Sequence, residues 1–250
     1  MPRCYLALGG NLGNVRQTFD WALDALGRTA ESSLIAVSTC HETHPVGEPA
    51  GTFLNAAVEI ETCLAPLTLL DRLQAIEHEL GRVRTVRWAP RTIDLDLIFY
   101  ESETIDTPRL TVPHPAVWYR RFVLDPLSEI APGYIHPVKR VDIKTLRDRL
   151  LERPLEVAFV GGEVKARRAL ARKLGEEFPS IRIFDDHGLE KTDAGVVHEP
   201  ALTIWLGNSS PRTSFDHEFD QLPQLSRIDA TKTSEPVEAY VKHVLQSALG

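Results

Sequence analysis

The sequence predicts an α+β protein in which an antiparallel sheet with helices on one face is followed by a smaller α/β domain with a parallel sheet. Residues 3–100 alternate between strand and helix patterns in the order β-α-β-β-α-β, which is the ferredoxin-like arrangement. After Arg153-Pro154 a new strand–helix–strand pattern begins, and such a unit implies parallel strands. We therefore expect one domain at residues 1–154 and an accessory domain at residues 155–250.

The first half of this order consists of two strands separated by a helix. The segment "RCYLALGG" has strand character and ends at paired glycines. "NLGNVRQTFDWALDALGRT" has apolar residues at helical spacing, can be capped by Asn11 or Asn14, and ends at Gly27. "SLIAVSTCHET" follows as a single strand candidate, before a loop rich in proline and glycine.

The second half repeats the pattern with a longer helix. Alternate residues of "FLNAAVEIET" are apolar, which predicts a strand with one buried face. "APLTLLDRLQAIEHELGR" predicts a helix with Pro66 in its first turn and Gly81 at its end. "TIDLDLIFY" alternates again and is rich in β-branched residues, so it predicts the last strand of the first domain.

Two aspartates lie one residue apart in this last strand. Because side chains alternate between the faces of a strand, Asp94 and Asp96 should point the same way, roughly 7 Å apart. The residues between and after them, Leu95, Leu97 and Phe99, should point into the core. Mg²⁺ commonly binds one or two carboxylates together with substrate phosphate oxygens. An isolated pair of this kind could equally form salt bridges with nearby arginines.

A cluster of arginines precedes the aspartates. The loop "GRVRTVRWAPR" contains Arg82, Arg84, Arg87 and Arg91, together with Trp88. The planar guanidinium group suits phosphate, so a nucleoside triphosphate with Mg²⁺ would account for both the arginines and the carboxylates. The alternative is an RNA-contacting loop with Trp88 as a stacking platform. That alternative leaves the carboxylates unexplained, and the net charge of −7 is not that of a general nucleic-acid binder.

Composition bounds the class of protein. The chain has 250 residues, 43% hydrophobic and 25% charged, as expected for a soluble globular protein of one large or two ordinary domains. Its apolar runs are shorter than the ~20 residues of a membrane span, and its N-terminus does not have the pattern of a signal peptide. Cys4, Cys40 and Cys63 lack metal-ligand spacing. We expect them to be reduced and buried in strands, in a cytoplasmic protein.

Several motifs together resemble one known family. "GRVRTVRWAPRTIDLDLIFY" closely resembles the signature of the 6-hydroxymethyl-7,8-dihydropterin pyrophosphokinases of folate biosynthesis, whose usual form is R-W-G-P-R-T-(L/I)-D-(L/I)-D. "LALGGNLGN", "TFLNAAVEIET" and "LTVPHPAVWYRRFVLDPLSEIAP" resemble further motifs of this family in the same order, over about Arg3 to Leu151. The resemblance implies that ATP is the co-substrate, that two Mg²⁺ ions are bound, and that a diphosphoryl group moves to the hydroxymethyl group of the pterin with release of AMP.

The resemblance also implies roles for individual residues. Asp94 and Asp96 would bind both Mg²⁺ ions, while Arg82 and Arg91 would act on the polyphosphate. The pterin would be bound by Thr43, Val46, Phe53, Asn55 and Phe122, with stacking between the two phenylalanines. ATP would contact Gln74, Glu77, Arg84, Trp88, Leu97, Arg109, Thr111, His114 and Arg120. Without the resemblance, Phe53 and Phe122 would be read as core residues and His114 could be a turn residue.

The chain departs from the family pattern at three positions. Ala89 replaces the usual glycine between tryptophan and proline, and alanine resists a positive φ. Phe53 replaces the commoner tyrosine, and Gly10 stands where serine is usual. These changes remove no expected metal ligand and no expected catalytic arginine. We therefore expect altered loop kinetics rather than loss of activity.

Residues 155–250 have no counterpart in the ordinary enzyme of this family. "VAFVGGEVKARRALARKL" has the strand–loop–helix rhythm of a P-loop, but a working loop reads G-x-x-x-x-G-K-(S/T). Counted from Gly161, the last three positions are Ala166, Arg167 and Arg168. The closing segments weakly resemble the end of a P-loop nucleoside or nucleotide kinase. We expect a degenerate accessory domain through which two copies could form a homodimer. The alternative is a second, nucleoside kinase activity in this domain.

Overall fold

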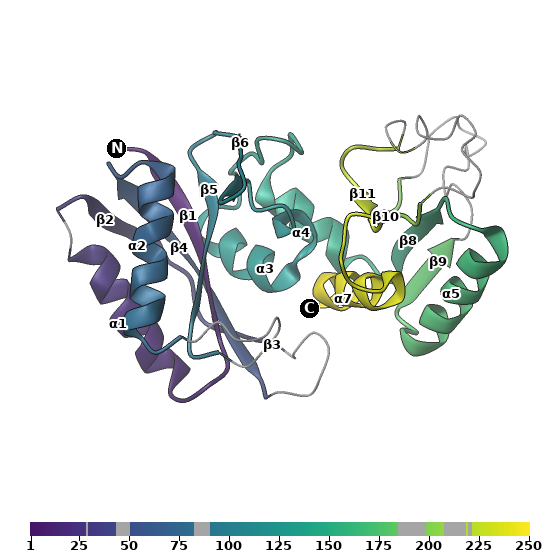
Figure 1. Cartoon of the computed structure of the whole chain (residues 1–250), viewed down its shortest axis with the longest axis horizontal. Helices are drawn as coiled ribbons and strands as arrows, with labels where there is room; N and C mark the ends of the chain where they lie inside the picture. The colour runs from purple at the N-terminus through teal and green to yellow at the C-terminus, as the bar shows by residue number, and fades with distance from the viewer. Residues whose placement is uncertain (29, 44–50, 83–90, 185–198, 208–218, 220–221) are drawn as a thin grey trace. The chain divides into compact units, whose positions relative to one another are not determined.

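The structure is a computed structural model, and it describes residues 1–28, 30–43, 51–82, 91–184, 199–207, 219 and 222–250 (Figure 1). Over these residues the chain divides into two compact units, Met1–Arg147 with Gly250 and Asp148–Leu249. The division falls inside helix α4 (Ile143–Leu151). Each unit contains a sheet of its own.

The first unit is built on an antiparallel sheet with the strand order β2-β4-β1-β5, in which β3 also pairs with β4. The strands of this sheet are β1 (Arg3–Gly10), β2 (Ser32–Val37), β3 (His41–Thr43), β4 (Phe53–Thr62) and β5 (Asp94–Tyr100). A separate two-stranded ribbon joins β6 (Ile105–Asp106) and β7 (Thr111–Val112).

Helices cover both faces of this sheet, so the expectation of helices on one face alone was wrong. The helices of the unit are α1 (Val15–Gly27), α2 (Pro66–Glu79), the short 3₁₀ helix η1 (Val117–Tyr119) and α3 (Arg121–Ile130). In Figure 1, α1 and α2 lie side by side on one face, and α3 lies on the other face against β4. Asn14 rather than Asn11 caps α1, since its Oδ1 accepts a hydrogen bond from the Gln17 N–H.

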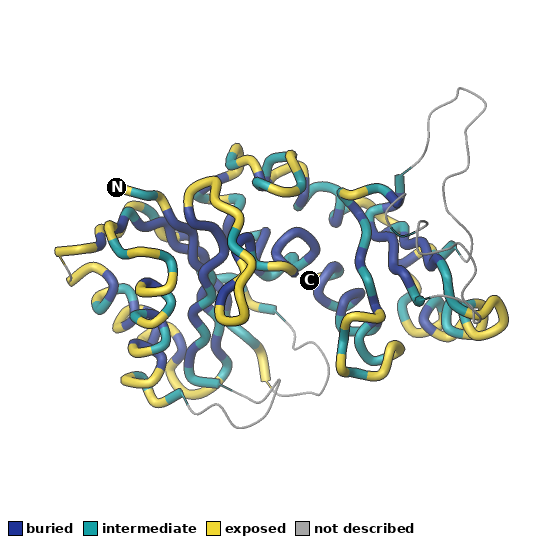
Figure 2. The backbone as a smooth tube through the Cα atoms, turned by 45° about the horizontal axis from the view of Figure 1, so that its top comes forward, coloured by how far each residue is buried: buried dark blue, intermediate teal, exposed yellow. Residues whose placement is uncertain are grey.

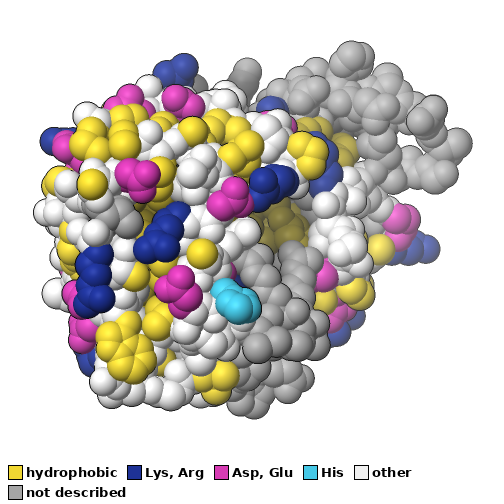
Figure 3. All heavy atoms as spheres, turned by 60° about the vertical axis from the view of Figure 1, so that its left-hand side comes forward, with side chains coloured by type: hydrophobic (Ala, Val, Ile, Leu, Met, Phe, Trp, Pro, Cys, Tyr) yellow, Lys and Arg dark blue, Asp and Glu magenta, His cyan; other side chains and the backbone are white. Residues whose placement is uncertain are grey.

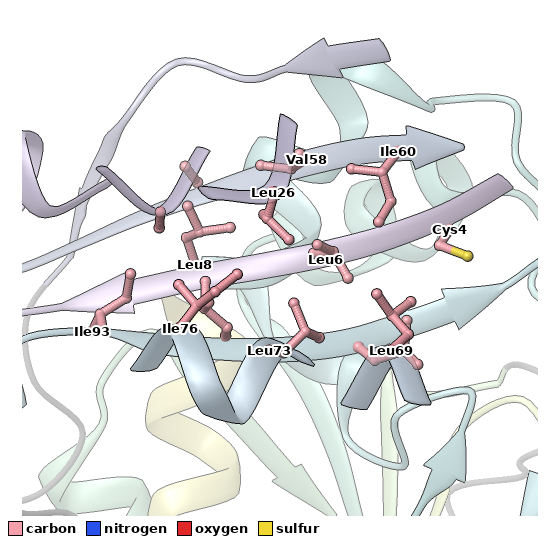
Figure 4. Packing of buried hydrophobic residues seen from close by; sticks show 14 of the residues in the cluster. Cys4, Leu6, Leu8, Leu26, Val58, Ile60, Leu69, Leu73, Ile76 and Ile93 are labelled. Carbon is pink, nitrogen blue, oxygen red and sulfur yellow. The ribbon is translucent and has the colours of Figure 1, made fainter. Parts of the chain in front are cut away.

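The core of the first unit lies between the sheet and helices α1 and α2 (Figure 4). The side chains labelled in that view are buried and come from the strands, both helices and the residue before β5: Cys4, Leu6, Leu8, Leu26, Val58, Ile60, Leu69, Leu73, Ile76 and Ile93. Since a slip of one residue would turn these side chains to the opposite face, their burial fixes the register of the sheet. The register in turn decides which side chains of β1, β4 and β5 face α3.

The single strand expected at "SLIAVSTCHET" is divided into β2 and β3. Ser38 separates them, because its hydroxyl takes part in the ladder. The Ala57 N–H donates to Ser38 Oγ at 2.8 Å, and the Ser38 N–H donates to the Ala57 carbonyl at 2.9 Å. After Ser38 the chain turns Thr39 toward α3, where it contacts Glu129. The prediction of one uninterrupted strand was therefore wrong.

Phe99 also differs from the prediction. The pairing of β1 and β5 changes register at this point, which leaves Ile98 as an additional residue of β5. The additional residue reverses the alternation, so Phe99 points away from the core cluster that contains Leu95 and Leu97. Its ring packs instead against Tyr134, with 4.6 Å between ring centroids. The expectation that Phe99 faces the same way as the two leucines was wrong.

The second unit contains a four-stranded sheet with the order β11-β10-β8-β9, and all its pairings are parallel. Its elements are β8 (Leu155–Val160), α5 (Val164–Glu177), β9 (Ile181–Phe184), β10 (Leu202–Trp205), β11 (Arg227–Asp229) and α7 (Val237–Leu249). The predicted parallel sheet is confirmed. In both units the buried residues follow the central strands (Figure 2).

Two further properties bear on the sequence-based expectations. None of the helices in the described parts of the chain combines the length and apolar character needed to cross a bilayer. All three cysteines are free thiols. Cys4 is buried and Cys40 is partly buried, but Cys63 is exposed because it lies just beyond the end of β4. The expectation that all three are buried was wrong for Cys63.

Candidate active site

The two aspartates lie near the start of β5, on the sheet face opposite the apolar core. Asp94 is paired across the sheet with Gly9, and Asp96 is paired with Ala7. Leu95, between them, belongs to the core cluster. Because strand side chains alternate, both carboxylates project from the face that α3 covers in part.

Asp94 lies between two arginines. Nη1 of Arg82 forms ion pairs with Oδ1 of Asp94 and with Oε1 of Glu77, and Nη1 of Arg91 pairs with Oδ2 of Asp94. The Glu77 side chain is 3% exposed, and its Oε1 also accepts the Leu95 N–H at 2.7 Å. Two arginines that flank residues 83–90 therefore meet at a single carboxylate on β5.

The Asp96 side chain is the second carboxylate of the site, and the charges of Asp94 and Arg82 act on it as well. Burial, and next the negative charge of Asp94, raise the pKa of Asp96 to about 6, while the positive charge of Arg120 opposes this shift. Two neighbouring carboxylates in a partly buried position are costly to ionise together. A cation between them would remove that cost.

His114 lies within the electrostatic influence of Asp94 and Arg120. Its backbone N–H donates to the Ile98 carbonyl at 3.0 Å. Its Nδ1 accepts the Ala116 N–H at 3.2 Å, so the neutral ring carries its proton on Nε2. Burial, and next the charge of Arg120, lower the pKa of His114 to about 3, while the charge of Asp94 acts in the opposite direction. His114 is therefore a neutral hydrogen-bond donor at physiological pH.

Asn55 lies in the same row of the sheet as Asp94. Gly9 of β1 is paired with Asn55 on one side and with Asp94 on the other. A Cβ atom on Gly9 would lie 3.4 Å from Asn55 Oδ1 and 3.9 Å from the Asp94 Cβ. The glycine thus leaves open the space between an amide and a carboxylate that come from β4 and β5, two strands whose backbones lie two strand spacings, or about 10 Å, apart.

The remaining pterin candidates are on β3, β4 and α3. Asn55 Nδ2 donates to Thr43 Oγ1 at 2.8 Å, and Thr43 is paired with Phe53. Phe122 lies in the first turn of α3, with Cζ of Arg120 5.6 Å from its ring centroid. Five residues discussed from the sequence lie outside the described residues, namely Val46, Arg84, Arg87, Trp88 and Ala89.

Two ATP candidates have other partners. Arg109 forms an ion pair with Asp71 of α2, and the two side chains are 58% and 56% exposed. Thr111 Oγ1 contacts Asp106 Oδ1 at 3.5 Å within the β6–β7 ribbon. Neither contact joins these residues to the group around Asp94.

Two further ATP candidates differ in what they can offer a ligand. The Leu97 side chain is 4% exposed and belongs to the core cluster, so only its backbone can face the carboxylates. Gln74 is partly exposed on α2, about one turn before Glu77.

Asn11 is a site residue that the sequence analysis considered only as a helix cap. Its Oδ1 accepts the Arg91 N–H at 2.8 Å, and its own N–H donates to the Arg91 carbonyl at 3.0 Å. The preceding Gly10 approaches β5 so closely that a Cβ atom there would lie 2.7 Å from the Thr92 carbonyl oxygen. In the sequence, the motif "GGNLG", which contains both Gly10 and Asn11, could have indicated that these two residues belong to the site.

The side chains present fit Mg²⁺. Among the described residues, no group of three or more His, Cys, Asp or Glu side chains forms a complete metal cage. Two same-face carboxylates next to arginines are instead the protein share expected for Mg²⁺, which retains water and takes further ligands from substrate phosphates. Asp94 and Asp96 would hold the ion.

Comparison with known proteins agrees with this geometry. The model of the 7,8-dihydro-6-hydroxymethylpterin-pyrophosphokinase (HPPK) family matches residues 5–132. The 2-amino-4-hydroxy-6-hydroxymethyldihydropteridine pyrophosphokinase of Pseudomonas aeruginosa is 49% identical over 134 residues, which are 53% of this chain and 82% of that protein. The enzyme of the same name from Bacillus subtilis is 49% identical over 127 residues, 50% of this chain and 76% of that protein.

A solved structure is similar in fold alone. Plasmodium falciparum HPPK-DHPS in complex with pteroate has a TM-score of 0.50 and 15% sequence identity, over 84% of this chain and 54% of that chain. Taken together, the sheet with its carboxylates and the sequence matches define an enzyme, a transferase of the pyrophosphokinase class. The chain belongs to the 7,8-dihydro-6-hydroxymethylpterin-pyrophosphokinase family. The resemblance seen in the sequence is therefore confirmed, and residues 155–250 lie outside the family match.

Proposed function

We propose that the chain transfers a diphosphoryl group from ATP to the hydroxymethyl group of 6-hydroxymethyl-7,8-dihydropterin. The hydroxymethyl oxygen would bond to the β-phosphorus as the bond from that phosphorus to the α,β-bridging oxygen breaks, and AMP would leave. Family membership supports the reaction. One observation in this chain supports the reaction most directly. Arg82 and Arg91 both form ion pairs with Asp94, and Asp94 lies in the same row of the sheet as Asn55.

The described side chains could bind the two substrates on β4 and β5, the strands on either side of β1. Asn55 would donate and accept hydrogen bonds at the edge of the pterin, with Phe53 and Phe122 against its faces. On the other side of Gly9, the carboxylates of Asp94 and Asp96 would bind the polyphosphate of ATP through Mg²⁺. The two strands that carry these side chains lie about 10 Å apart, so a pterin held at Asn55 could direct its hydroxymethyl group at a phosphate near the carboxylates. Holding both reactants in line is a large part of catalysis in phosphoryl transfer.

The arginines would exchange partners when the substrate binds. In the structure, Arg82 and Arg91 neutralise Asp94. Mg²⁺, when bound by Asp94 and Asp96, would neutralise phosphate oxygens and stabilise charge in the transition state. The two guanidinium groups could then turn to the phosphate oxygens, which suit their planar donors. His114 would add a neutral N–H donor, and Arg120 a positive charge, on the ATP side.

AMP release tests this proposal directly. We would incubate the full chain with ATP and Mg²⁺, with and without 6-hydroxymethyl-7,8-dihydropterin, and repeat the assay with the Asp94→Ala/Asp96→Ala double variant. The expected result is AMP formation that requires the pterin and is lost in the double variant. No AMP from a folded full chain, as judged by circular dichroism, would refute the proposal. Omitting Mg²⁺ should abolish AMP formation as well.

RNA binding by the arginine segment is less consistent with the chain. The net charge is −7, and on the face shown in Figure 3 lysine and arginine side chains are interspersed with aspartate and glutamate. Arg82 and Arg91, at the ends of the segment, are paired with carboxylates. RNA binding that weakens steeply with salt, without pterin turnover, would favour this alternative.

We further propose that residues 155–250 form an accessory domain without a nucleotide site of the P-loop kind. A phosphate would bind at the N-terminus of α5, but there the carboxylate of Glu163 accepts the N–H groups of Lys165 and Ala166 at 3.0 and 2.8 Å. The Gly162 N–H donates to the Gly207 carbonyl at 2.5 Å. These contacts use the backbone donors that a phosphate would need.

Nucleotide binding by this domain can be tested with the full chain that carries Asp94→Ala/Asp96→Ala. Isothermal titration with ATP, ADP and nucleosides should then detect no binding. A nucleoside-dependent formation of ADP would support the alternative of a second kinase activity. A chain of residues 1–154, first checked for folding, should keep pterin-dependent AMP formation if residues 155–250 are accessory.

The finer expectations from the sequence remain part of this proposal. The strand order of the first unit supports a ferredoxin-like domain, and we propose its end at residue 154. A homodimer through the accessory domain, a cytoplasmic location, two Mg²⁺ ions and the degenerate P-loop ancestry of residues 155–250 are likewise predictions. Light scattering on the full chain and on residues 1–154 would test the dimer.

A further inference from the structure

We infer that Glu129 is a positioning residue for the pterin-binding strand: its carboxylate, on α3, holds the segment that leads into β3. The inference rests on the function proposed above, because it concerns the same site. Glu129 lies far from Thr39 and His41 in the sequence, and it joins α3 to the sheet at the point where β2 and β3 separate.

The contact is a set of short hydrogen bonds to one carboxylate. Oε2 of Glu129 accepts the Thr39 N–H at 2.7 Å, and Oε1 accepts the Thr39 hydroxyl at 2.8 Å. Oε1 also lies 2.6 Å from Nε2 of His41. The three donors belong to two residues on either side of Cys40, so the carboxylate fixes both the turn after β2 and the first residue of β3.

The held segment is in direct register with the pterin candidates. His41 is paired with Asn55, and Thr43 is paired with Phe53. Thr43 Oγ1 accepts the hydrogen bond from Asn55 Nδ2 at 2.8 Å. By holding the start of β3, Glu129 of α3 therefore helps to position Thr43, which accepts the hydrogen bond from the Asn55 amide.

β3 depends on this contact because it has little else to hold it. It is three residues long and pairs with β4 alone among the described strands, and its residues are exposed or only partly buried. Ser38 has already interrupted the continuous ladder with β4. Charge-assisted hydrogen bonds to a carboxylate are about twice as strong as neutral ones, so Glu129 supplies a large share of what fixes the strand.

Loss of the contact should affect pterin binding more than catalysis. If β3 leaves its place for roughly nine-tenths of the time, the apparent dissociation constant of the pterin rises about tenfold, because only the remaining fraction binds. Saturating pterin restores the bound arrangement. We therefore expect a higher KM for the pterin with kcat changed by less than about twofold, and a KM for ATP that stays the same.

The experiment compares Glu129→Ala and Glu129→Gln with wild type in the full chain. Glu42→Gln is the matched control. Glu42 is the middle residue of β3, its side chain is 68% exposed, and Oε1 of Glu42 lies 3.9 Å from Nη2 of Arg16. KM and kcat are measured for each substrate from AMP release. Hydrogen exchange of the amides of residues 40–43 is measured alongside.

Glu129→Ala should raise the KM for the pterin about tenfold and speed exchange in residues 40–43. Glu129→Gln keeps one acceptor oxygen and should be intermediate, and Glu42→Gln should match wild type. An active wild type with an unchanged pterin KM in Glu129→Ala would overturn the inference alone. Equal increases in the KM values for ATP and pterin would also overturn it. A wild-type chain that makes no AMP would instead refute the proposed function.

Discussion

The guanidinium group of Arg82 joins two carboxylates from different elements, Glu77 of α2 and Asp94 of β5. The Glu77 side chain is almost completely buried and also accepts a backbone hydrogen bond from β5. Arg82 therefore has two roles in the structure. It neutralises a buried glutamate that ties α2 to the strand, and it neutralises the aspartate expected to bind Mg²⁺.

Replacing Arg82 should damage both activity and stability. In Arg82→Ala, the buried side chain of Glu77 loses its cation, which for a buried pair costs about 3 kcal/mol of unfolding free energy. Loss of an arginine that stabilises a transferring phosphoryl group should lower kcat by roughly 10³-fold. Arg82→Lys keeps the charge without the two-sided planar donor and should be intermediate. Urea unfolding and AMP release measure the two effects.

The control is Arg28→Ala. Arg28 pairs with Asp24 on α1 at 2.9 Å, but the two side chains are 77% and 63% exposed. An exposed pair of this kind contributes about 0–1 kcal/mol, so stability and AMP release should be close to those of wild type. Full activity in Arg82→Ala would refute the role given to Arg82.

Gly10 should not tolerate a side chain. A Cβ atom there would lie 2.7 Å from the Thr92 carbonyl oxygen and 3.0 Å from Cγ1 of Val15. Since the first of these is a backbone atom, Gly10→Ala should push β1 from β5 and destabilise the fold by about 1–3 kcal/mol. The serine usual in the family should do the same in this chain.

Thermal unfolding of Gly10→Ala tests this, with Gly27→Ala as the control. Gly27 is the last residue of α1, and a Cβ atom there would meet no atom within 4 Å. Gly27→Ala should leave Tm unchanged or raise it, because alanine favours the helix. A Gly10→Ala chain that melts with wild type would show that the close approach is not required.

His114 should remain neutral across the working range of the enzyme. Burial and the charge of Arg120 lower its pKa to about 3, and Nδ1 is engaged by the Ala116 N–H. The ring should therefore be the Nε2–H tautomer from pH 5 to pH 8. Imidazole ¹⁵N chemical shifts, assigned with His114→Asn, measure this. A ring that becomes protonated near pH 6 would contradict the burial of the site.

Patterns of local sequence predicted much of this molecule, for identifiable reasons. The alternation in "TIDLDLIFY" placed Asp94 and Asp96 on one face and Leu95 on the other, because a buried face fixes the register. The same pattern failed at Phe99, since an additional residue at Ile98 depends on pairing with β1 and leaves no local signal. Helices and strands that follow from local sequence patterns were predictable. Irregularities that depend on pairing with a distant strand were not.

The site was predictable from residue types but not in its contacts. The arginines and aspartates were found from the motif, whereas the bond from Glu77 to the Leu95 N–H depends on how α2 packs on β5. Glu129 could not be found, because its partners Thr39 and His41 are brought to α3 only after Ser38 divides the strand. Val46, Arg84 and Trp88 lie outside the described residues, and their roles stay predictions.

Asp96 should make the ligand-free fold less stable at neutral pH. Burial and the charge of Asp94 raise its pKa to about 6, above the ~3.9 of an unfolded chain. The folded state thus binds this proton more tightly than the unfolded state. The stabilising contribution is complete below about pH 4 and is lost as the pH rises through 6. Asp96→Asn removes the penalty, so it should raise Tm at pH 7.5 relative to wild type but not at pH 4, while AMP formation is lost.

The size and sign of the change in stability distinguish the titration of Asp96 from that of carboxylates whose pKa is lowered in the folded state. The rise of the Asp96 pKa from ~3.9 to about 6 corresponds to roughly 3 kcal/mol as an upper limit, and partial exposure of Asp96 reduces this contribution. Asp142→Ala is the contrasting variant, because the Thr145 N–H bond at 2.6 Å helps to lower the pKa of Asp142. That variant should lose stability at pH 7.5. A lower Tm for Asp96→Asn at pH 7.5 would mean that its carboxylate is already neutralised without Mg²⁺, and the arginines around Asp94 would then be compensating both aspartates.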